Sequence, residues 1–260
     1  MSDPYLSVDN LTVAFGGVMA LDHVSFSFAD SKIGAVIGPN GAGKSTLFNC
    51  ITGLQAPTSG EISRDGRRIT GQTPKQLVDN GIARTFQNLA LIPEASVEEN
   101  ILLGRHRLGH YGLLRGAIRD PWVRRDEKKQ LEAIQPIIDE LGLRSVLHDE
   151  LQSLSYGVRK KVEIGRALAQ MPSLLLLDEP MAGVDSAEKP ELSELIRRAT
   201  QNRDLHVVMV EHDMSVIMGL ADEIVVLDFG RLIAHGTPAQ VRNDPAVIEA
   251  YLGADFETDH

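Results

Sequence analysis

A glycine-rich loop after a short apolar run is the feature that most constrains this chain. The run is Ile33–Ile37, and the loop that follows reads Gly38-Pro39-Asn40-Gly41-Ala42-Gly43-Lys44-Ser45-Thr46. This is the P-loop spacing G-x-x-x-x-G-K-[ST], in which inward-facing backbone N–H groups and the N-terminus of the next helix hold phosphate oxygens. Lys44 would reach the β- and γ-phosphates, and the Ser45 hydroxyl would bind Mg²⁺. The motif predicts a strand, a phosphate-binding loop and a helix, with ATP or GTP as the ligand.

The composition is that of a globular protein. The 260 residues are 43% hydrophobic and 24% charged, which fits one large or two small domains with a buried core. No apolar run approaches the ~18 residues that cross a bilayer, and the first residues lack the pattern of a signal peptide. The single cysteine, Cys50, excludes an internal disulfide framework and fits a reducing compartment. A net charge of −10 argues against a protein that wraps nucleic acid, so we expect a cytosolic protein with other partners.

Hydrophobic periodicity predicts the order of strands and helices. Alternating apolar residues predict strands over 6–15 and 24–28, and Asp65-Gly66 predicts a tight hairpin. We expect the opening third of the chain to form a mixed sheet with antiparallel ribbons. Later apolar runs predict strands at 82–85, 174–177, 206–210 and 224–227, and helices at 73–80, 159–170 and 187–200.

A helical segment interrupts this α/β pattern. Ser96-Val97-Glu98-Glu99 has the capping-box spacing and predicts a helix start. From there to about residue 153 the pattern is helical, with Pro121 and Pro136 as interruptions or helix starts. We therefore predict one domain, in which residues 1–90 and 154–260 form an α/β nucleotide-binding core and residues 91–153 form an inserted helical subdomain.

Two acids follow the apolar run Leu174-Leu175-Leu176-Leu177. Asp178, at the carboxyl end of the predicted strand, is placed to hold the Mg²⁺ shell as Walker B aspartates do. Glu179 would face the γ-phosphate and could take a proton from the attacking water. A strand that ends in solvated acids is common on its own, and the upstream P-loop favours the functional interpretation.

The stretch Leu154-Ser155-Tyr156-Gly157-Val158 precedes a predicted helix and resembles the L-S-G-G-Q signature of the ATP-binding cassette family. Alone, Ser155 could be an ordinary helix cap, although a helix N-terminus also attracts anions. The resemblance implies that Ser155 and Gly157 complete the ATP site of an opposite subunit, so that two chains clamp two nucleotides. It also implies a RecA-like P-loop NTPase core with an antiparallel β subdomain and an inserted helical subdomain.

Three more residues match positions of this family. His212, after the run 206–210, corresponds to the switch histidine that contacts the γ-phosphate and the attacking water, although such a histidine alone decides nothing. Gln87 corresponds to the Q-loop glutamine, which touches Mg²⁺ or water and links the site to the helical subdomain. Phe15 takes the place of the aromatic residue that stacks on adenine. Tyr5 is a weaker candidate, and Phe15 could equally serve as a core aromatic.

Four segments narrow the resemblance to the ATPase subunits of branched-chain amino acid importers: 84–88, 104–129, 211–214 and 247–253. This implies an ATP hydrolase that uses Mg²⁺ at the cytoplasmic face of the inner membrane. It drives permease subunits and depends indirectly on a periplasmic or extracellular solute-binding protein. The alternatives are a related urea or amide importer, an exporter, or a soluble cassette ATPase acting on nucleic acid or ribosomes. The soluble relatives usually carry a long coiled coil or two cassettes, and this chain has neither.

The chain departs from the family pattern in the signature and in the loop after the acids. Tyr156 replaces a glycine and Val158 replaces a glutamine, so Val158 cannot donate a side-chain hydrogen bond to the opposite nucleotide. Asp185 stands where relatives usually have asparagine. Because Lys44, Asp178, Glu179 and His212 are all present, we expect ATP hydrolysis to be retained.

Overall fold

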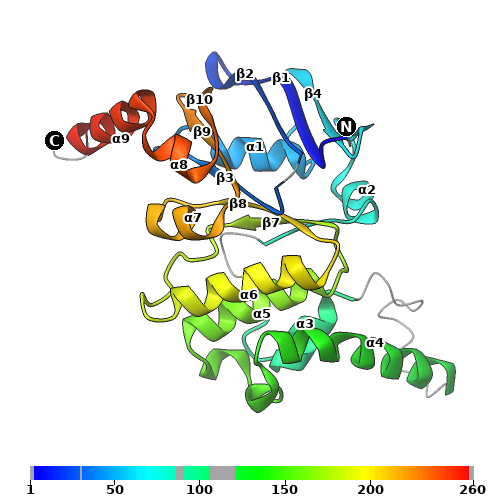
Figure 1. Cartoon of the computed structure of the whole chain (residues 1–260). Coiled ribbons are helices and arrows are strands. Elements are labelled where there is room, and N and C mark those ends of the chain that lie inside the picture. The colour runs from blue at the N-terminus through cyan, green and yellow to red at the C-terminus, as the bar shows by residue number, and fades with distance from the viewer. Residues whose placement is uncertain (1–2, 30, 86–90, 106–120, 258–260) are drawn as a thin grey trace.

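The computed structural model describes residues 3–29, 31–85, 91–105 and 121–257, arranged as two sheets and surrounding helices (Figure 1). The first sheet is antiparallel, with the strand order β2-β1-β4-β5. It consists of β1 (Leu6–Phe15), β2 (Val18–Phe28), β4 (Ser59–Arg64) and β5 (Arg67–Arg68). Asp65 and Gly66 both have positive φ, as a type I′ turn requires, so the predicted hairpin is confirmed.

The second sheet has six strands in the order β10-β9-β3-β8-β7-β6. Five are parallel: β3 (Ile33–Ile37), β6 (Ile82–Arg84), β7 (Leu174–Asp178), β8 (His206–Val210) and β9 (Glu223–Asp228). β10 (Arg231–Gly236) pairs antiparallel with β9 at one edge. The prediction of one mixed sheet in the opening third is therefore wrong. β3 belongs to the second sheet although β1, β2 and β4 form the first. All five residues of β3 are buried, which suits a parallel strand covered on both faces.

The helices follow the predicted caps closely. Ser96 Oγ accepts from the Glu99 N–H at 3.2 Å while Glu99 Oε2 accepts from the Ser96 N–H at 2.8 Å, which confirms the capping box. The helices are α1 (Lys44–Ile51), α2 (Pro74–Asp79), α3 (Val97–Leu103), α4 (Pro121–Glu140), α5 (Tyr156–Leu168), α6 (Lys189–Asn202), α7 (Met214–Leu220), α8 (Pro238–Arg242) and α9 (Pro245–Glu257), with 3₁₀ turns at Arg144–Val146 and Leu151–Ser153.

Pro121 begins α4 as predicted, but Pro136 neither starts nor interrupts a helix. It lies inside α4 at an exposed position, where a proline removes one backbone hydrogen bond. Its neighbours Ile134, Ile137 and Ile138 are buried in the main apolar cluster. Burial of this apolar face outweighs the local preference of one residue.

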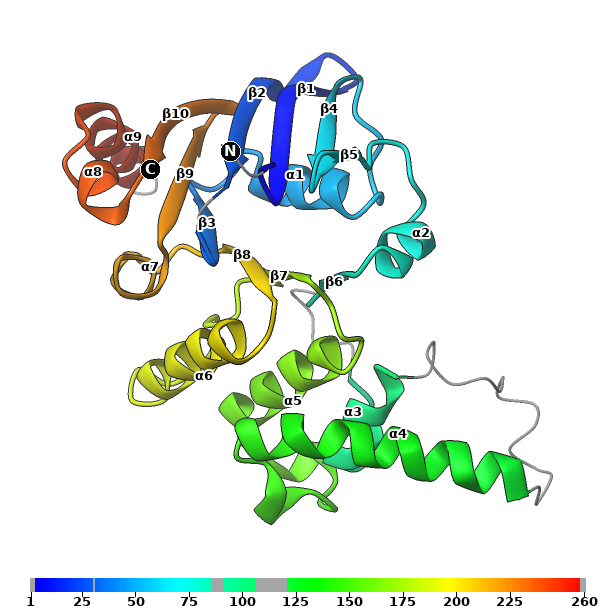
Figure 2. The ribbon, with the colours of Figure 1, turned by 45° about the vertical axis from the view of Figure 1, so that its right-hand side comes forward.

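Helices α3, α4 and α5 lie together at one end of the molecule, and the antiparallel sheet lies at the other (Figures 1 and 2). α5 packs against α3, α4 and β6. The boundaries 91–153 of a helical subdomain remain a prediction. Among the described residues, no helix is both long enough and apolar enough to cross a membrane.

Two apolar clusters cover opposite faces of the six-stranded sheet. Ile33, Ala35 and Ile37 of β3 belong to a cluster with α3, α4, α5, α6 and α7. Val36, between them, belongs to the other cluster, with α1 and the antiparallel sheet. This alternation is the period of two of a strand.

Candidate functional site

The parallel strands bring the P-loop, the two acids and His212 to one edge of the sheet. The P-loop follows β3, Asp178 ends β7, and His212 comes two residues after the end of β8. β8 lies between β3 and β7, and its last residue, Val210, is in register with both Val36 and Asp178. The carboxyl ends of parallel strands meet at the same edge, where ligands of open α/β sheets bind.

Two glycines of the P-loop combine a positive φ with no room for a side chain. Gly38 and Gly43 have φ of 148° and 99°. A Cβ atom on Gly38 would lie 2.0 Å from the carbonyl oxygen of Leu227, and one on Gly43 would lie 2.5 Å from that of Ala20. The loop is thus packed directly against β9 and β2. It delivers the chain to α1, which begins at Lys44, so that its first N–H groups face the loop.

The other loop residues differ in exposure. Asn40, Gly41 and Ser45 are exposed, Pro39 and Thr46 are half-buried, and Ala42 is buried.

Lys44 is buried within this loop. Its Nζ donates to the carbonyl oxygens of Gly38 at 2.7 Å and Pro39 at 2.8 Å. Burial lowers the pKa of Lys44, while the nearby charges of Glu179 and Asp178 oppose that effect. The lysine therefore lies between the loop and the two acids, and Nζ must leave these carbonyls to reach a phosphate.

The two acids are held differently. Asp178 is buried, and its Oδ2 accepts from Arg84 Nη2 at 2.6 Å. Glu179 has a positive φ of 48°, and its N–H donates to the Val210 carbonyl at 2.9 Å. This turn directs the chain away from β7 immediately after the buried aspartate.

A divalent cation fits the oxygen groups at this edge. The Ser45 hydroxyl and the Asp178 carboxylate are the oxygen ligands that Mg²⁺ prefers. Within the described ranges, no group of three or more His, Cys, Asp or Glu residues could hold a metal by itself. Mg²⁺ usually takes one or two protein ligands together with phosphates and water.

His212 is exposed, and the buried Glu211 positions its backbone. Glu211 Oε1 accepts from the Met181 N–H at 2.7 Å, and Oε2 accepts from the His212 N–H at 3.2 Å. Burial raises the pKa of Glu211. This carboxyl joins the loop after β7 to the turn after β8, a link that the sequence analysis missed. An acid directly after four apolar strand residues was the available signal.

Asp213 fixes the other side of the same turn. Its Oδ1 accepts from the Ser215 N–H at 3.1 Å at the start of α7, and its Oδ2 pairs with Lys189 Nζ at 2.6 Å. The Lys189 ammonium lowers the pKa of Asp213, and the pKa of Lys189 is raised in return. The start of α6 is therefore tied to the histidine turn.

The two aromatic candidates differ in exposure: Phe15 is exposed and Tyr5 is buried. The Phe15 side chain is 49% exposed at the end of β1, in a hairpin whose second strand contacts Gly43 through Ala20. Tyr5 is 3% exposed, stacks on His206 with 4.0 Å between ring centroids, and shares a hydrogen bond with Ser31. Its interpretation as an adenine-stacking residue is wrong, because the ring is buried in the core.

Two signature residues, Tyr156 and Gly157, lie against Gly183 and Glu188, which follow the two acids. Ser155 caps α5, with Oγ accepting from the Val158 N–H at 3.4 Å. A Cβ atom on Gly157 would lie 2.2 Å from Glu188 Oε2, and one on Gly183 would lie 2.9 Å from the Tyr156 ring. Ser155 is therefore exposed at the N-terminus of α5, directly before these two packed residues.

The two departures from the family pattern lie at different depths in the structure. Val158 packs against the main apolar cluster. Asp185 is exposed, and its Oδ1 accepts from the Ala187 N–H at 2.9 Å. Gln87 lies outside the described residues.

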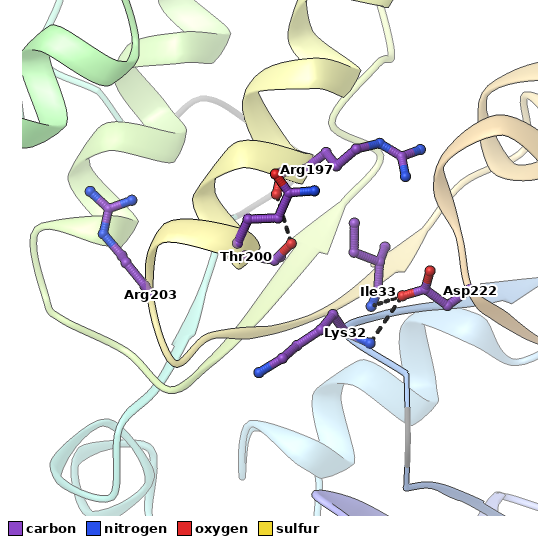
Figure 3. Close-up of a pocket in the computed structure, with 7 residues that line it drawn as sticks. Lys32, Ile33, Arg197, Thr200, Arg203 and Asp222 are labelled. Atoms are coloured by element: carbon purple, nitrogen blue, oxygen red, sulfur yellow. Dashed lines mark hydrogen bonds between the residues drawn. The ribbon is translucent and has the colours of Figure 1, made fainter.

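A surface pocket of about 390 Å³ lies at the opposite end of the strands (Figure 3). It is lined by Lys32 and Ile33 at the start of β3, by Asp222 ahead of β9, and by residues of the last turns of α6 such as Arg197. Asp222 Oδ2 accepts from the Lys32 and Ile33 N–H groups at 3.0 and 2.9 Å. The pocket is therefore separate from the edge that carries the P-loop and the acids.

Comparison with known proteins gives two family matches. A family model described as "ABC transporter" matches residues 21–182, which include the P-loop, Ser155 and Asp178. A second model, described as "Branched-chain amino acid ATP-binding cassette transporter", matches residues 231–257.

Individual relatives cover almost the whole chain. The high-affinity branched-chain amino acid transport ATP-binding proteins LivG of Escherichia coli strain K12 and BraF of Pseudomonas aeruginosa are each 39% identical to it. The match spans 253 residues, 97% of this chain and 99% of each relative. The solved ADP conformation of MJ1267, an ATP-binding cassette of an ABC transporter, has a TM-score of 0.85 and 32% identity, and the match covers 97% of this chain and 100% of that one.

Proposed function

Because the chain belongs to the ABC transporter family of ATP-hydrolysing subunits, we propose that it powers the import of branched-chain amino acids through membrane permease subunits. The observation that carries the proposal is the extent of the match to LivG and BraF, which runs over 97% of the chain. The second family model adds support, because it covers residues 231–257, outside the ATPase motifs.

We infer the following roles at the sheet edge. The N–H groups of residues 38–46, together with Lys44, bind the phosphates, and Phe15 stacks on adenine. Glu179 orients the attacking water and takes its proton, and His212 contacts the γ-phosphate and that water. Ser45 and Asp178, with Gln87, would hold Mg²⁺, which supplies positive charge against the transferring phosphoryl group.

The second half of each ATP site comes, we propose, from another chain. Tyr156 and Gly157 lie against Gly183 and Glu188 of their own chain, while Ser155 caps α5, whose exposed N-terminus can accept an anion from a partner. Two ATPase chains, identical or paralogous, would then enclose two nucleotides.

The proposed place of work is the cytoplasmic face of the inner membrane. Transport ATPases of this family act with permease subunits, and a periplasmic or extracellular solute-binding protein would deliver the amino acid to those permeases. The net charge of −10 supports partners other than nucleic acid.

The ATPase mechanism is tested by Glu179→Gln, which keeps the shape of the side chain and removes its basicity. We expect turnover to fall by about 10²–10⁴-fold, the usual contribution of a general base, while ATP binding is retained. Turnover is measured by phosphate release, and ATP binding by calorimetry.

The matched control is Glu194→Gln on the exposed face of α6, where the acid lies 4.0 Å from Arg198 and both side chains are exposed. An exposed ion pair contributes little, so this variant should hydrolyse ATP like the wild type. Unchanged turnover in Glu179→Gln would contradict the role of Glu179.

The transported solute is tested in vesicles that contain the ATPase, its permeases and the solute-binding protein. Leucine, isoleucine or valine should stimulate ATP hydrolysis and be taken up. Stimulation by urea or a short amide instead would overturn the substrate assignment while leaving the ATPase assignment intact.

A further inference from the structure

Arg84 forms a buried ion pair with the aspartate that we expect to bind Mg²⁺. It is the last residue of β6, and its Nη2 donates to Asp178 Oδ2 at 2.6 Å. The two side chains are only 8% and 6% exposed. Arg84 is in register with Leu176 of the neighbouring strand, so the side chain reaches two residues further along β7.

The other half of the guanidinium is fixed by α1. Nη1 donates to Asn49 Oδ1 at 2.8 Å and to Thr52 Oγ1 at 3.2 Å, and the guanidinium carbon lies 5.6 Å from the centroid of the Phe48 ring. Planar, forked donors lose little freedom when held in this way. Because α1 begins at Lys44, Arg84 connects the helix of the P-loop to Asp178.

Thr85 holds the main chain of the same aspartate. The Asp178 N–H donates to Thr85 Oγ1 at 3.2 Å, and the Thr85 N–H donates to the Leu176 carbonyl at 2.9 Å. The end of β6 therefore fixes both the backbone and the carboxylate of Asp178.

We propose that Arg84 is a positioning residue for Mg²⁺: it holds Asp178 Oδ2 so that the other carboxylate oxygen is presented to the metal. This inference rests on the proposed role of Asp178. Stability alone would not explain this ion pair, since buried pairs often add no net free energy of folding compared with apolar packing. Arg84 binds the expected metal ligand Asp178 and is also held by α1. Both contacts favour a role for Arg84 in orienting that ligand.

Two effects of Arg84 on the metal oppose each other. Its positive charge repels a nearby cation, whereas its hydrogen bonds fix the orientation of the ligand. Loss of an outer partner of a metal ligand typically costs about 10–100-fold in metal affinity or activity, so we expect orientation to dominate.

The test is the Mg²⁺ concentration that gives half-maximal binding of a fluorescent ATP analogue to the full chain. Arg84→Lys keeps the charge and loses the fork, so it should raise this concentration by about ten-fold. Arg84→Gln loses both the charge and the fork, and should raise the half-maximal Mg²⁺ concentration at least as much. Binding of the analogue in EDTA should stay within about two-fold of the wild type in both variants, because the phosphate-binding loop is untouched.

Arg64→Lys is the matched control. Arg64 is also buried, and it donates to the Asn80 carbonyl and to Ser173 Oγ, away from Asp178. This variant loses a buried fork of the same kind and should leave the Mg²⁺ requirement unchanged. Asn49→Ala, which removes one anchor of Arg84 and keeps the pair with Asp178, should give a smaller rise in the same direction and serves if the arginine variants do not fold.

Three outcomes would overturn the inference. A wild-type Mg²⁺ requirement in both Arg84→Lys and Asn49→Ala would mean that the pair only supports the fold. A lowered requirement in Arg84→Gln, with Arg84→Lys unchanged, would mean that charge repulsion dominates. If Asp178→Asn, measured alongside, leaves the Mg²⁺ requirement unchanged, the proposed role of Asp178 fails, and the inference fails with it.

Discussion

At the scale of single residues, Lys44, Asp178 and Glu211 are ionisable groups buried at the sheet edge, and each is held by specific partners. Lys44 donates to two loop carbonyls, Asp178 pairs with Arg84, and Glu211 accepts from two backbone N–H groups. A buried charge without such a partner would be costly. These contacts therefore set the positions from which each group meets a nucleotide.

Lys44→Ala is the direct test of phosphate binding at this scale. A hydrogen bond to a charged group contributes about 1.5–3 kcal/mol, so the Kd for ATP should rise by roughly 10–100-fold. Calorimetric titration measures the change, with Lys75→Ala on the exposed face of α2 as the control. Normal ATP affinity in Lys44→Ala would contradict the phosphate-binding role of the loop.

Sequence reasoning located residues whose role depends on short motifs and missed those whose partners are distant. The P-loop and the acids lie in continuous stretches, and the structure brings them to one edge. Arg84 and Asp178 are separated by 94 positions, and Glu211 is separated from Met181 by 30. Such pairs depend on strand order, which no local pattern specifies.

At the scale of elements, the start of α5 is packed against the start of α6 and the loop before it. Glu188 lies against Gly157, and the Tyr156 ring lies against Gly183. Lys160 is also buried, with Nζ 3.3 Å from Glu163 Oε2 and 5.8 Å from the centroid of the Tyr156 ring. The signature and the loop after the acids should therefore move together.

Gly157→Ala tests this coupling. The added methyl group would meet the Glu188 carboxylate, which must rotate away, and we expect ATP turnover to fall. In Gly157→Ala/Glu188→Ala the clash is absent, and turnover should return toward that of Glu188→Ala alone. Contacting residues couple by about 0.5–3 kcal/mol, or roughly 2–100-fold in rate. Turnover numbers of the four proteins form the cycle, and additive effects would show that the two residues act independently.

Local elements were the most predictable part of the fold. The Asp65-Gly66 turn and the Ser96 capping box depend on neighbouring residues alone, and both are as predicted. The prediction for Pro136 is wrong because the buried face of α4, which overrides its local preference, forms only through tertiary packing. The separation of β3 from the antiparallel ribbons likewise depends on pairing with β8 and β9, far along the chain.

At the scale of the whole molecule, the P-loop follows β3 and the exposed signature residue Ser155 precedes α5, so one chain carries both halves of the proposed ATP site on different elements. A pair of chains would then contain two composite ATP sites. Mixing Lys44→Ala with Ser155→Ala places both defects in one site and leaves the other site intact.

We therefore expect the mixture to hydrolyse ATP faster than either variant alone, as measured by phosphate release over a range of mixing ratios. Either variant mixed with itself serves as the control. Activity that never exceeds that of the separate variants would argue that each chain works without the other's signature.

Because β3 contributes residues to both apolar clusters, it affects how the molecule unfolds. Ile33, Ala35 and Ile37 lie in one cluster and Val36 lies in the other, and the phosphate loop continues directly from this strand. Unfolding of either cluster would expose one face of β3 to water. We therefore expect the loop that follows β3 to lose its structure when either cluster unfolds. A ligand bound to this loop stabilises every part of the chain that must stay folded for the ligand to bind. Nucleotide occupancy is thereby linked to the cooperativity of the entire chain, not to the persistence of a single lobe.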